Sequence, residues 1–244
     1  MLNELKKQVC EANLDLVRSG LVIQTFGNAS AIDRAGGHVV IKPSGVAYDG
    51  MRPSHMVIVS LATGKVVEGN LRPSSDTPTH LVLYRAFRQI GGIVHTHSLY
   101  AAAWAQARRE IPALGTTHAD YFHGQVPCTR LMTAAEIRSD YETNTGHVIV
   151  ERFGRLDPSS FPGVLVASHG PFAWGESVAD AVHHAVVLEY LARLASETVR
   201  LNPGIRPMQH ALLDKHFLRK HGRTAYYGQN KPSHTREPST RHTP

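Results

Sequence analysis

The chain has 244 residues, of which 42% are hydrophobic and 19% charged, and its formal net charge is +6. This balance predicts a packed globular protein and excludes general disorder. No arginine-rich stripe interleaved with aromatic residues accompanies the positive charge. We therefore expect an anionic small molecule as partner and no nucleic acid.

The sequence gives no sign of a membrane or secreted protein. No apolar run approaches the roughly 20 residues of a spanning helix, so no membrane partner is expected. The first residues lack the apolar core of a secretory signal. Cys10 and Cys128 lie far apart and outside any CxxC pattern, so they predict neither a disulfide framework nor a cysteine metal site. We expect a reduced, cytoplasmic setting.

The first third of the chain begins with a helix and continues with strands. Residues 1–20 repeat apolar side chains at spacings of three and four, which is typical of an amphipathic helix that Gly20 can end. Residues 21–75 contain β-branched runs between Gly and Pro, which predict strands and turns. Residues 76–90 read as a helix that Asp76 or Ser75 can cap, and a strand over 93–97 follows a Gly–Gly break.

The remaining segments are mainly helical. Residues 99–108, 133–152, 177–200 and 207–221 have helical patterns, whereas 163–167 reads as a short buried strand. The irregular order of strands and helices favours a mixed sheet covered by helices over a doubly wound parallel sheet. We expect a single folded domain over residues 1–228, followed by a flexible polar tail over 229–244.

The strongest local feature is the pair His95 and His97. Two residues apart on a strand, the rings point to one face and can give two nitrogen ligands to one zinc ion. The alternative is a pair of surface histidines in a chain that has 16, but the apolar residues before the pair predict a buried strand. The third ligand is open among His169, at the end of another buried strand, and the rivals His118 and His80. Three histidines leave a coordination position for substrate, as in a catalytic site.

Two Ser/Gly turns, at residues 42–45 and 72–76, form a second feature. The second turn leads into a predicted helix, whose free N–H groups and dipole favour a phosphate. Ordinary helix capping is the alternative explanation. Neither turn is a Walker A loop and no GxGxxG pattern occurs, so nucleotide binding is not indicated.

A third feature is Asp120, which is followed by two aromatic residues. Such surroundings can raise the pKa of a carboxyl group so that it serves as an acid or base. Most aspartates of this kind are helix caps or surface groups, so the feature alone is weak.

Taken together, several long stretches resemble the bacterial L-ribulose-5-phosphate 4-epimerases, a family within the class II aldolase superfamily. The resemblance covers about residues 1–229. It implies a three-layer α/β/α sandwich around a mixed, mostly antiparallel sheet. The stretches that carry it are TFGNAS (25–30), IKPSGV (41–46), PSSDTPTH (73–80), GIVHTHS (92–98), GTTHADY (115–121), SHGPFAWG (168–175), LDKH (213–216) and AYYGQ (225–229).

The resemblance also implies a complete site. Zn²⁺, with Mn²⁺ or Co²⁺ as substitutes, would be held by His95, His97 and His169, with Asp76 close to the ion or ligating it. Asp120 and Tyr227 would be the acid–base pair. A homotetramer is implied, in which the C-terminal segment reaches a neighbouring subunit and places active sites at subunit interfaces. The implied substrate-binding residues are Gly27, Asn28, Lys42, Ser44, Gly45, Ser74, Ser75, Thr116, His216 and Arg219.

The implied reaction interconverts L-ribulose 5-phosphate and D-xylulose 5-phosphate. Carbon 4 is not next to the carbonyl, so its proton is not acidic enough for simple abstraction. It does carry the β-hydroxyl of an aldol. Cleavage of the C3–C4 bond and re-addition to the other face of the aldehyde therefore invert it. A metal ion can stabilise the enediolate as a Lewis acid, and two acid–base residues serve the two faces.

Alternatives remain at this point. An aldolase of the L-fuculose-phosphate type is the nearest, but a glutamate is expected there at the position of Asp76. A sugar-phosphate dehydratase of the same fold is a lesser alternative, and a non-catalytic adducin-like module should lack the metal histidines. Phe26 stands where relatives usually carry tryptophan, in a core or pocket wall. The pathway stays open between L-arabinose and L-ascorbate breakdown.

Overall fold

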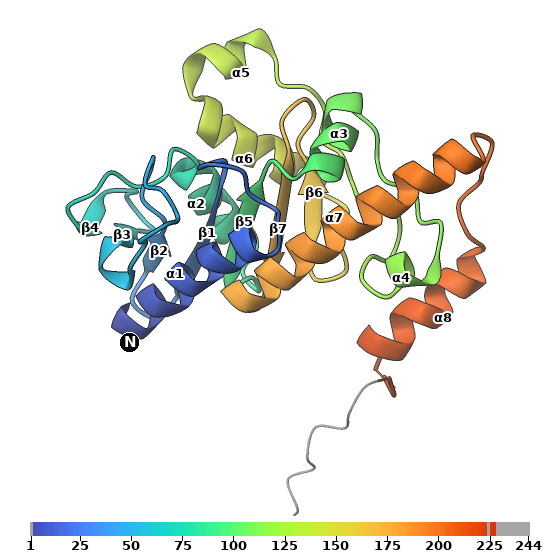
Figure 1. The fold of residues 1–244 in the computed structure, drawn as a ribbon, viewed down its shortest axis with the longest axis horizontal. Helices are drawn as coiled ribbons and strands as arrows, with labels where there is room; N and C mark the ends of the chain where they lie inside the picture. Colours follow the sequence, from blue (N-terminus) through green and yellow to red (C-terminus); the bar gives the residue numbers. More distant parts are fainter. Residues whose placement is uncertain (1, 224, 228–244) are drawn as a thin grey trace, which may run out of the picture.

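A computed structural model describes residues 2–223 and 225–227, and a seven-stranded sheet forms its centre (Figure 1). The strand order is β4-β3-β2-β1-β5-β7-β6. All neighbouring strands pair antiparallel, and the one parallel pairing among the described residues is an isolated bridge between Cys128 and Leu165. The strands are β1 (Gly27–Asp33), β2 (His38–Ile41), β3 (Val57–Ser60), β4 (Val66–Glu68), β5 (Gly92–Thr96), β6 (Gly163–Leu165) and β7 (Pro171–Gly175).

Helices cover both faces of this sheet. The helices α1 (Leu2–Arg18) and α7 (Val178–Leu201) cross one face, in front of the sheet in Figure 1. The helices α2 (Thr77–Ala86) and α6 (Tyr141–Arg152) pack on the other. The expected three-layer α/β/α sandwich with a mostly antiparallel sheet is confirmed.

Alternation along the central strands explains the two layers. Val94 belongs to the apolar cluster under α1 and α7, whereas its neighbour Ile93 belongs to the cluster under α2 and α6. Successive strand residues point to opposite faces, so His95 shares the face of Ile93. Gly92 admits the close approach of α7, since a Cβ there would lie 2.3 Å from the Cα of Val178. The pattern therefore directs His95 toward the layer that holds α2 and α6.

A smaller group of helices lies beyond β6. These are α3 (Leu99–Ala107), α4 (Thr116–Ala119) and α8 (His210–His221), whereas α5 (Ala134–Ser139) packs against α6. The short helix η1 (Pro53–His55) precedes β3. Figure 1 shows α4 and α8 side by side, beyond the C-terminal half of α7. Within the described part of the chain, no helix is both long and apolar enough to span a membrane.

Most predicted elements occur close to their expected bounds, with three corrections. The helix expected over 133–152 is two helices, because Asp140 ends α5 and caps α6 by accepting a hydrogen bond from the backbone N–H of Thr143. The helix expected over 76–90 ends at Ala86, and the strand expected over 163–167 ends at Leu165. Strand β7 and helix α4 were not predicted. The expected tail, 229–244, lies outside the described residues.

Candidate metal and sugar-phosphate site

Three histidines meet where β5 and the turn before β7 come together. His95 lies in β5, and His97 follows just after the strand ends. His169 lies in the turn between β6 and β7. The antiparallel pairing of β5 with β7, which sets His95 opposite Phe172, brings this turn to the end of β5. Sheet pairing thus joins residues that lie more than seventy positions apart.

The ring nitrogens of these histidines converge. One potential ligand nitrogen from each ring lies within 4.8 Å of the other two. The ring centroids of His95 and His97 are 4.9 Å apart, and those of His95 and His169 are 4.7 Å apart. The Nε2 atoms of His95 and His97 face each other at 3.1 Å. This is the arrangement that a single ion with nitrogen ligands requires.

The contacts behind the rings set their protonation. Nδ1 of His95 lies 2.9 Å from the carbonyl oxygen of Pro171, which can only accept, so in the neutral ring Nδ1 carries the proton and Nε2 the lone pair. Burial, with the neighbouring histidines, lowers the pKa of His169 to about 3, and burial also lowers the pKa of His97. These two imidazoles are therefore neutral near pH 7, as metal ligands must be.

Asp76 stands beside the three histidines. It occupies the N-cap position of α2, but its side chain makes no capping hydrogen bond, contrary to the capping role expected from sequence. Its Oδ2 instead accepts a hydrogen bond of 2.6 Å from Asn28 Nδ2. Burial opposes ionisation of Asp76, but His95, His80 and Asn28 outweigh it and lower the pKa of the carboxyl group. Asp76 is thus an anion next to the cluster, and its direct ligation of an ion remains a prediction.

The two rival histidines are used elsewhere. His80 is fully buried, and its Nδ1 lies 2.7 Å from Ser30 Oγ. His118 Nε2 donates to the carbonyl oxygen of Gly124 at 2.6 Å. Neither belongs to the cluster of possible ligands found among the described residues. Of the three candidates for the third ligand, the structure brings His169 to the pair.

A cavity of about 400 Å³ opens over the histidines. It joins the metal residues to the two Ser/Gly turns, which are held together by hydrogen bonds from Ser44 N to Arg72 O and from Ser74 N to Lys42 O. The start of α2 closes one side, so the N-terminus of that helix faces the cavity. Its lining residues are Thr25, Phe26, Gly27, Asn28, Lys42, Pro43, Ser44, Gly45, Ser74, Ser75, Asp76, His95, His97, Tyr141, Glu142 and His169.

Lys42 is the one cationic side chain among these described lining residues. It is 2% exposed, and its Nζ donates to the carbonyl oxygens of Val46, at 2.9 Å, and Pro43, at 3.2 Å. Burial lowers its pKa to about 8. A buried ammonium group whose hydrogen bonds go to carbonyl oxygens, with no carboxylate partner among the described residues, can bind an anion.

Sequence reasoning missed two lining residues, Tyr141 and Glu142. They begin α6, and the unpredicted helix break at Asp140 brings them to the cavity. Thr79 Oγ1 of α2 donates to the carbonyl oxygen of Glu142 at 2.6 Å, which fixes the start of α6 against α2. The available signal was Asp140 itself, a favoured N-cap residue inside an otherwise helical pattern. Phe26, expected in a core or pocket wall, does line the cavity.

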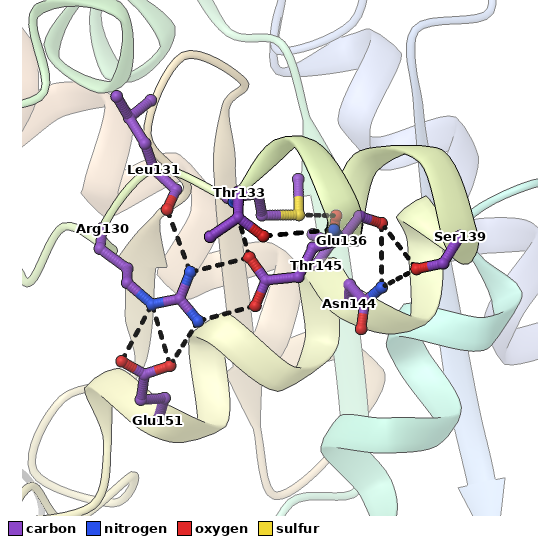
Figure 2. A network of polar contacts seen from close by, with 9 residues as sticks. Arg130, Leu131, Thr133, Glu136, Ser139, Asn144, Thr145 and Glu151 are labelled. Atoms are coloured by element: carbon purple, nitrogen blue, oxygen red, sulfur yellow. Dashed lines mark hydrogen bonds and ion pairs between the residues drawn. The ribbon is translucent and has the colours of Figure 1, made fainter.

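A polar network holds the two helices around this break (Figure 2). Arg130 forms ion pairs with Glu136 of α5, at 2.8 Å, and with Glu151 of α6, at 2.7 Å. On the cavity side, Thr145 Oγ1 donates to the carbonyl oxygen of Tyr141 at 2.9 Å. The Arg130 ion pairs thus join α5 to the last turn of α6, whereas the Thr145 contact lies in its first turn.

The expected acid–base residues lie in a different place. Asp120, at the end of α4, receives hydrogen bonds from His216 Nδ1 at 3.1 Å and Arg219 at 3.0 Å, both on α8. Burial acts to raise the pKa of Asp120, but the hydrogen bonds from these partners have the larger effect and lower that pKa. The ring of Tyr227 is 57% exposed and stacks under the guanidinium of Arg219 at 4.3 Å.

Thr116, at the start of α4, belongs to this second group with Asp120, His216, Arg219 and Tyr227. None of the five is among the described residues that line the cavity. Within one chain, the structure therefore gathers the predicted metal and phosphate residues at the cavity and leaves the predicted acid–base residues outside it.

The residues at the cavity fit a divalent ion. Three imidazoles converge, that of His95 is oriented by the Pro171 carbonyl, and an anionic carboxylate stands beside them. The buried Oδ1 of Asn28 has no partner within the described residues, which leaves an unused acceptor at the cavity. Nitrogen-rich sites of this kind suit zinc and also accept manganese or cobalt.

Comparisons with known proteins show the family of the chain. Residues 7–196 match the family model of the class II aldolase and adducin N-terminal domain. The chain is 58% identical to "L-ribulose-5-phosphate 4-epimerase UlaF" of Salmonella paratyphi A and of Salmonella typhi, over 228 residues that cover 93% of this chain and 100% of each relative. The resemblance inferred from the motifs is confirmed by these matches.

Solved structures share the fold. An L-fuculose 1-phosphate aldolase is similar with a TM-score of 0.74 and 25% identity, over 87% of this chain and 94% of that chain. YgbL of Klebsiella pneumoniae, described as a putative aldolase/epimerase/decarboxylase, has a TM-score of 0.70 and 23% identity, over 88% and 98% of the two chains. The second likeness supports the fold alone.

Proposed function

The chain belongs to the class II aldolase and adducin family, and from that premise we propose that it is an L-ribulose-5-phosphate 4-epimerase. The reaction interconverts L-ribulose 5-phosphate and D-xylulose 5-phosphate. The observation that carries the proposal is the cavity in which three converging histidines adjoin two Ser/Gly turns and a buried lysine. The match to epimerases over their full length supports the same substrate.

The phosphate end of the cavity would grip the aldehyde fragment after C3–C4 cleavage. The hydroxyls of Ser44, Ser74 and Ser75 and the backbone N–H groups of Gly45 and Ser75 are the donors of the two turns, and Lys42 supplies a positive charge. Asn28 and the backbone at Gly27 line the passage from these turns to the histidines. A held fragment can rotate without leaving, which distinguishes epimerisation from net aldol cleavage.

The metal end is formed by His95, His97 and His169, with Asp76 beside them. A divalent ion, which we propose to be Zn²⁺, with Mn²⁺ and Co²⁺ as substitutes, supplies Lewis acidity toward the ketone side of the substrate when bound. The protein fixes the rings through the Pro171 carbonyl and holds Asp76 through Asn28. It thereby presents a preformed set of ligands.

Proton transfer at the C4 hydroxyl needs one group on each face of the aldehyde, and we assign it to Asp120 and Tyr227. These residues lie away from the cavity of their own chain. We therefore propose a cytoplasmic homotetramer in which one subunit carries Asp120 and Tyr227, with Thr116, His216 and Arg219, to the cavity of its neighbour. The exposed ring of Tyr227 supports this placement, because a ring already buried in its own chain could not reach another.

The alternative is a fragment-releasing aldolase of the L-fuculose-phosphate type, whose fold this chain shares. The aspartate at position 76, where that type is expected to carry glutamate, favours the epimerase. An adducin-like binding module is disfavoured because the chain keeps three converging histidines.

The test is a coupled assay for D-xylulose 5-phosphate alongside an aldolase assay on the same sample. We expect epimerase turnover that a chelator abolishes and added metal restores. Full turnover after exhaustive metal removal would contradict the metal mechanism. Release of dihydroxyacetone that is faster than epimerisation would favour the aldolase. Tyr227→Phe should lower turnover with metal content unchanged, since Tyr227 is assigned no part in ligation. Metal loss in that variant would make Tyr227 structural.

A further inference from the structure

The first residue of α6 contacts the metal histidine that lies farthest along the chain. Tyr141 Oη is 3.3 Å from Nδ1 of His169, and the two ring centroids are 6.1 Å apart. Tyr141 is half-buried and its side chain lines the cavity. We propose that Tyr141 is a positioning residue that fixes His169 as an Nε2 ligand and directs its own phenolic proton to a substrate oxygen.

The first half of the proposal follows from the two nitrogens of an imidazole. A neutral ring has one N–H and one lone pair, and the group that contacts one nitrogen decides which of them faces the ion. In His95 this group is the carbonyl oxygen of Pro171 behind Nδ1. For His169, Tyr141 Oη holds the same position behind Nδ1. The structure therefore gives both rings an Nδ1 partner and leaves both Nε2 atoms for the ion, as is usual at metal sites.

The second half follows from the hydroxyl proton. When His169 uses Nε2 as a ligand, its Nδ1 carries the proton and donates to Tyr141 Oη. The phenolic proton then cannot point at Nδ1 and must find another acceptor. Because Tyr141 lines the cavity, the oxygens of a bound sugar phosphate are within its surroundings. This part rests on the proposed function, whereas the contact with His169 does not.

The surroundings of Tyr141 hold it in place for such a role. Its carbonyl oxygen accepts from Thr145 Oγ1 at 2.9 Å, and the next carbonyl, of Glu142, accepts from Thr79 Oγ1 of α2 at 2.6 Å. The ion pairs of Arg130 join α5 to the last turn of α6 (Figure 2). A backbone held from two sides is what a positioning group needs.

The experiment compares Tyr141→Phe with Tyr190→Phe. The control removes a hydroxyl from a 53% exposed ring on α7, outside the cavity. Zinc affinity is measured by competition with a chromophoric chelator, in the absence of any sugar, and folding is checked by circular dichroism. We expect Tyr141→Phe to bind zinc about ten- to a hundredfold more weakly than wild type, which is the usual effect of losing such a partner, and the control to match wild type.

At saturating zinc, Tyr141→Phe should also lose about tenfold in kcat/KM for L-ribulose 5-phosphate, as expected for one lost hydrogen bond. Wild-type zinc affinity in a folded Tyr141→Phe protein would overturn the role toward His169. Weaker zinc binding with an unchanged kcat/KM at saturating zinc would overturn the contact with substrate. If wild type binds zinc but does not epimerise, the proposed function fails while the zinc comparison still decides the role of Tyr141 toward His169.

Discussion

Replacing Gly170 by alanine should damage both the fold and the metal site. A Cβ at Gly170 would lie 2.8 Å from the carbonyl oxygen of Thr96 and 3.5 Å from the His97 ring. Neither side can yield easily, because Thr96 is paired with Gly27 in the sheet and Gly170 follows His169 in a tight turn. The backbone must shift, and overpacking of this kind costs about 1–3 kcal/mol.

For a chain of this length, each kcal/mol lowers Tm by about 2–4 °C. The displaced turn carries His169 away from His95 and His97, so zinc affinity should fall as well. Thermal unfolding and chelator competition measure the two effects. Gly204→Ala is the matched control, since a Cβ there meets only one atom, at 3.7 Å. Equal Tm and equal zinc affinity in the two variants would refute the reasoning.

Two further predictions concern pH. Burial lowers the pKa of Lys42 to about 8, and a bound phosphate favours the charged form of the amine. The KM for the sugar phosphate should therefore rise as pH increases through about 8. Lys42→Met should raise KM at pH 7 and abolish this pH dependence. Burial lowers the pKa of His118 from 6.5 to about 4, so the unfolded chain takes up a proton first and stability is lost as pH falls through that window. Between pH 7 and 5 this amounts to about 2 kcal/mol. The measurement is the free energy of unfolding in urea at both pH values. His118→Gln, which keeps a donor for Gly124, should lose less stability between pH 7 and 5 than wild type, by that amount. An equal loss in the two proteins would contradict the assignment.

The parts of the site that sequence predicted are those encoded locally. The two-residue period of a strand places His95 and His97 on one face, and the Ser/Gly turns are visible as composition. His169 was one of three candidates for the third ligand, and the sequence pattern could not choose among them. Its proximity to His95 and His97 depends on the pairing of β5 with β7, which was not predicted. The motif resemblance supplied that choice.

Tyr141 escaped prediction for a different reason. The apolar spacing over 133–152 fits one continuous helix, and only the cap at Asp140 divides it. A single polar residue carries little weight in a periodicity argument, yet here it decides which side chains reach the cavity. Asp76 shows the converse, since its cap position was predicted but its carboxylate is turned to Asn28.

The separation of the two groups of polar residues has a genetic consequence. The histidine cavity is formed by the sheet and the starts of α2 and α6, whereas Asp120 and Tyr227 sit with α4 and α8. In the proposed assembly, each working site takes one group from each of two chains. A subunit without His95 and a subunit without Tyr227, both inactive alone, would form some intact sites when mixed. Inactivating substitutions would thus fall into two complementation groups, one for each end of the molecule.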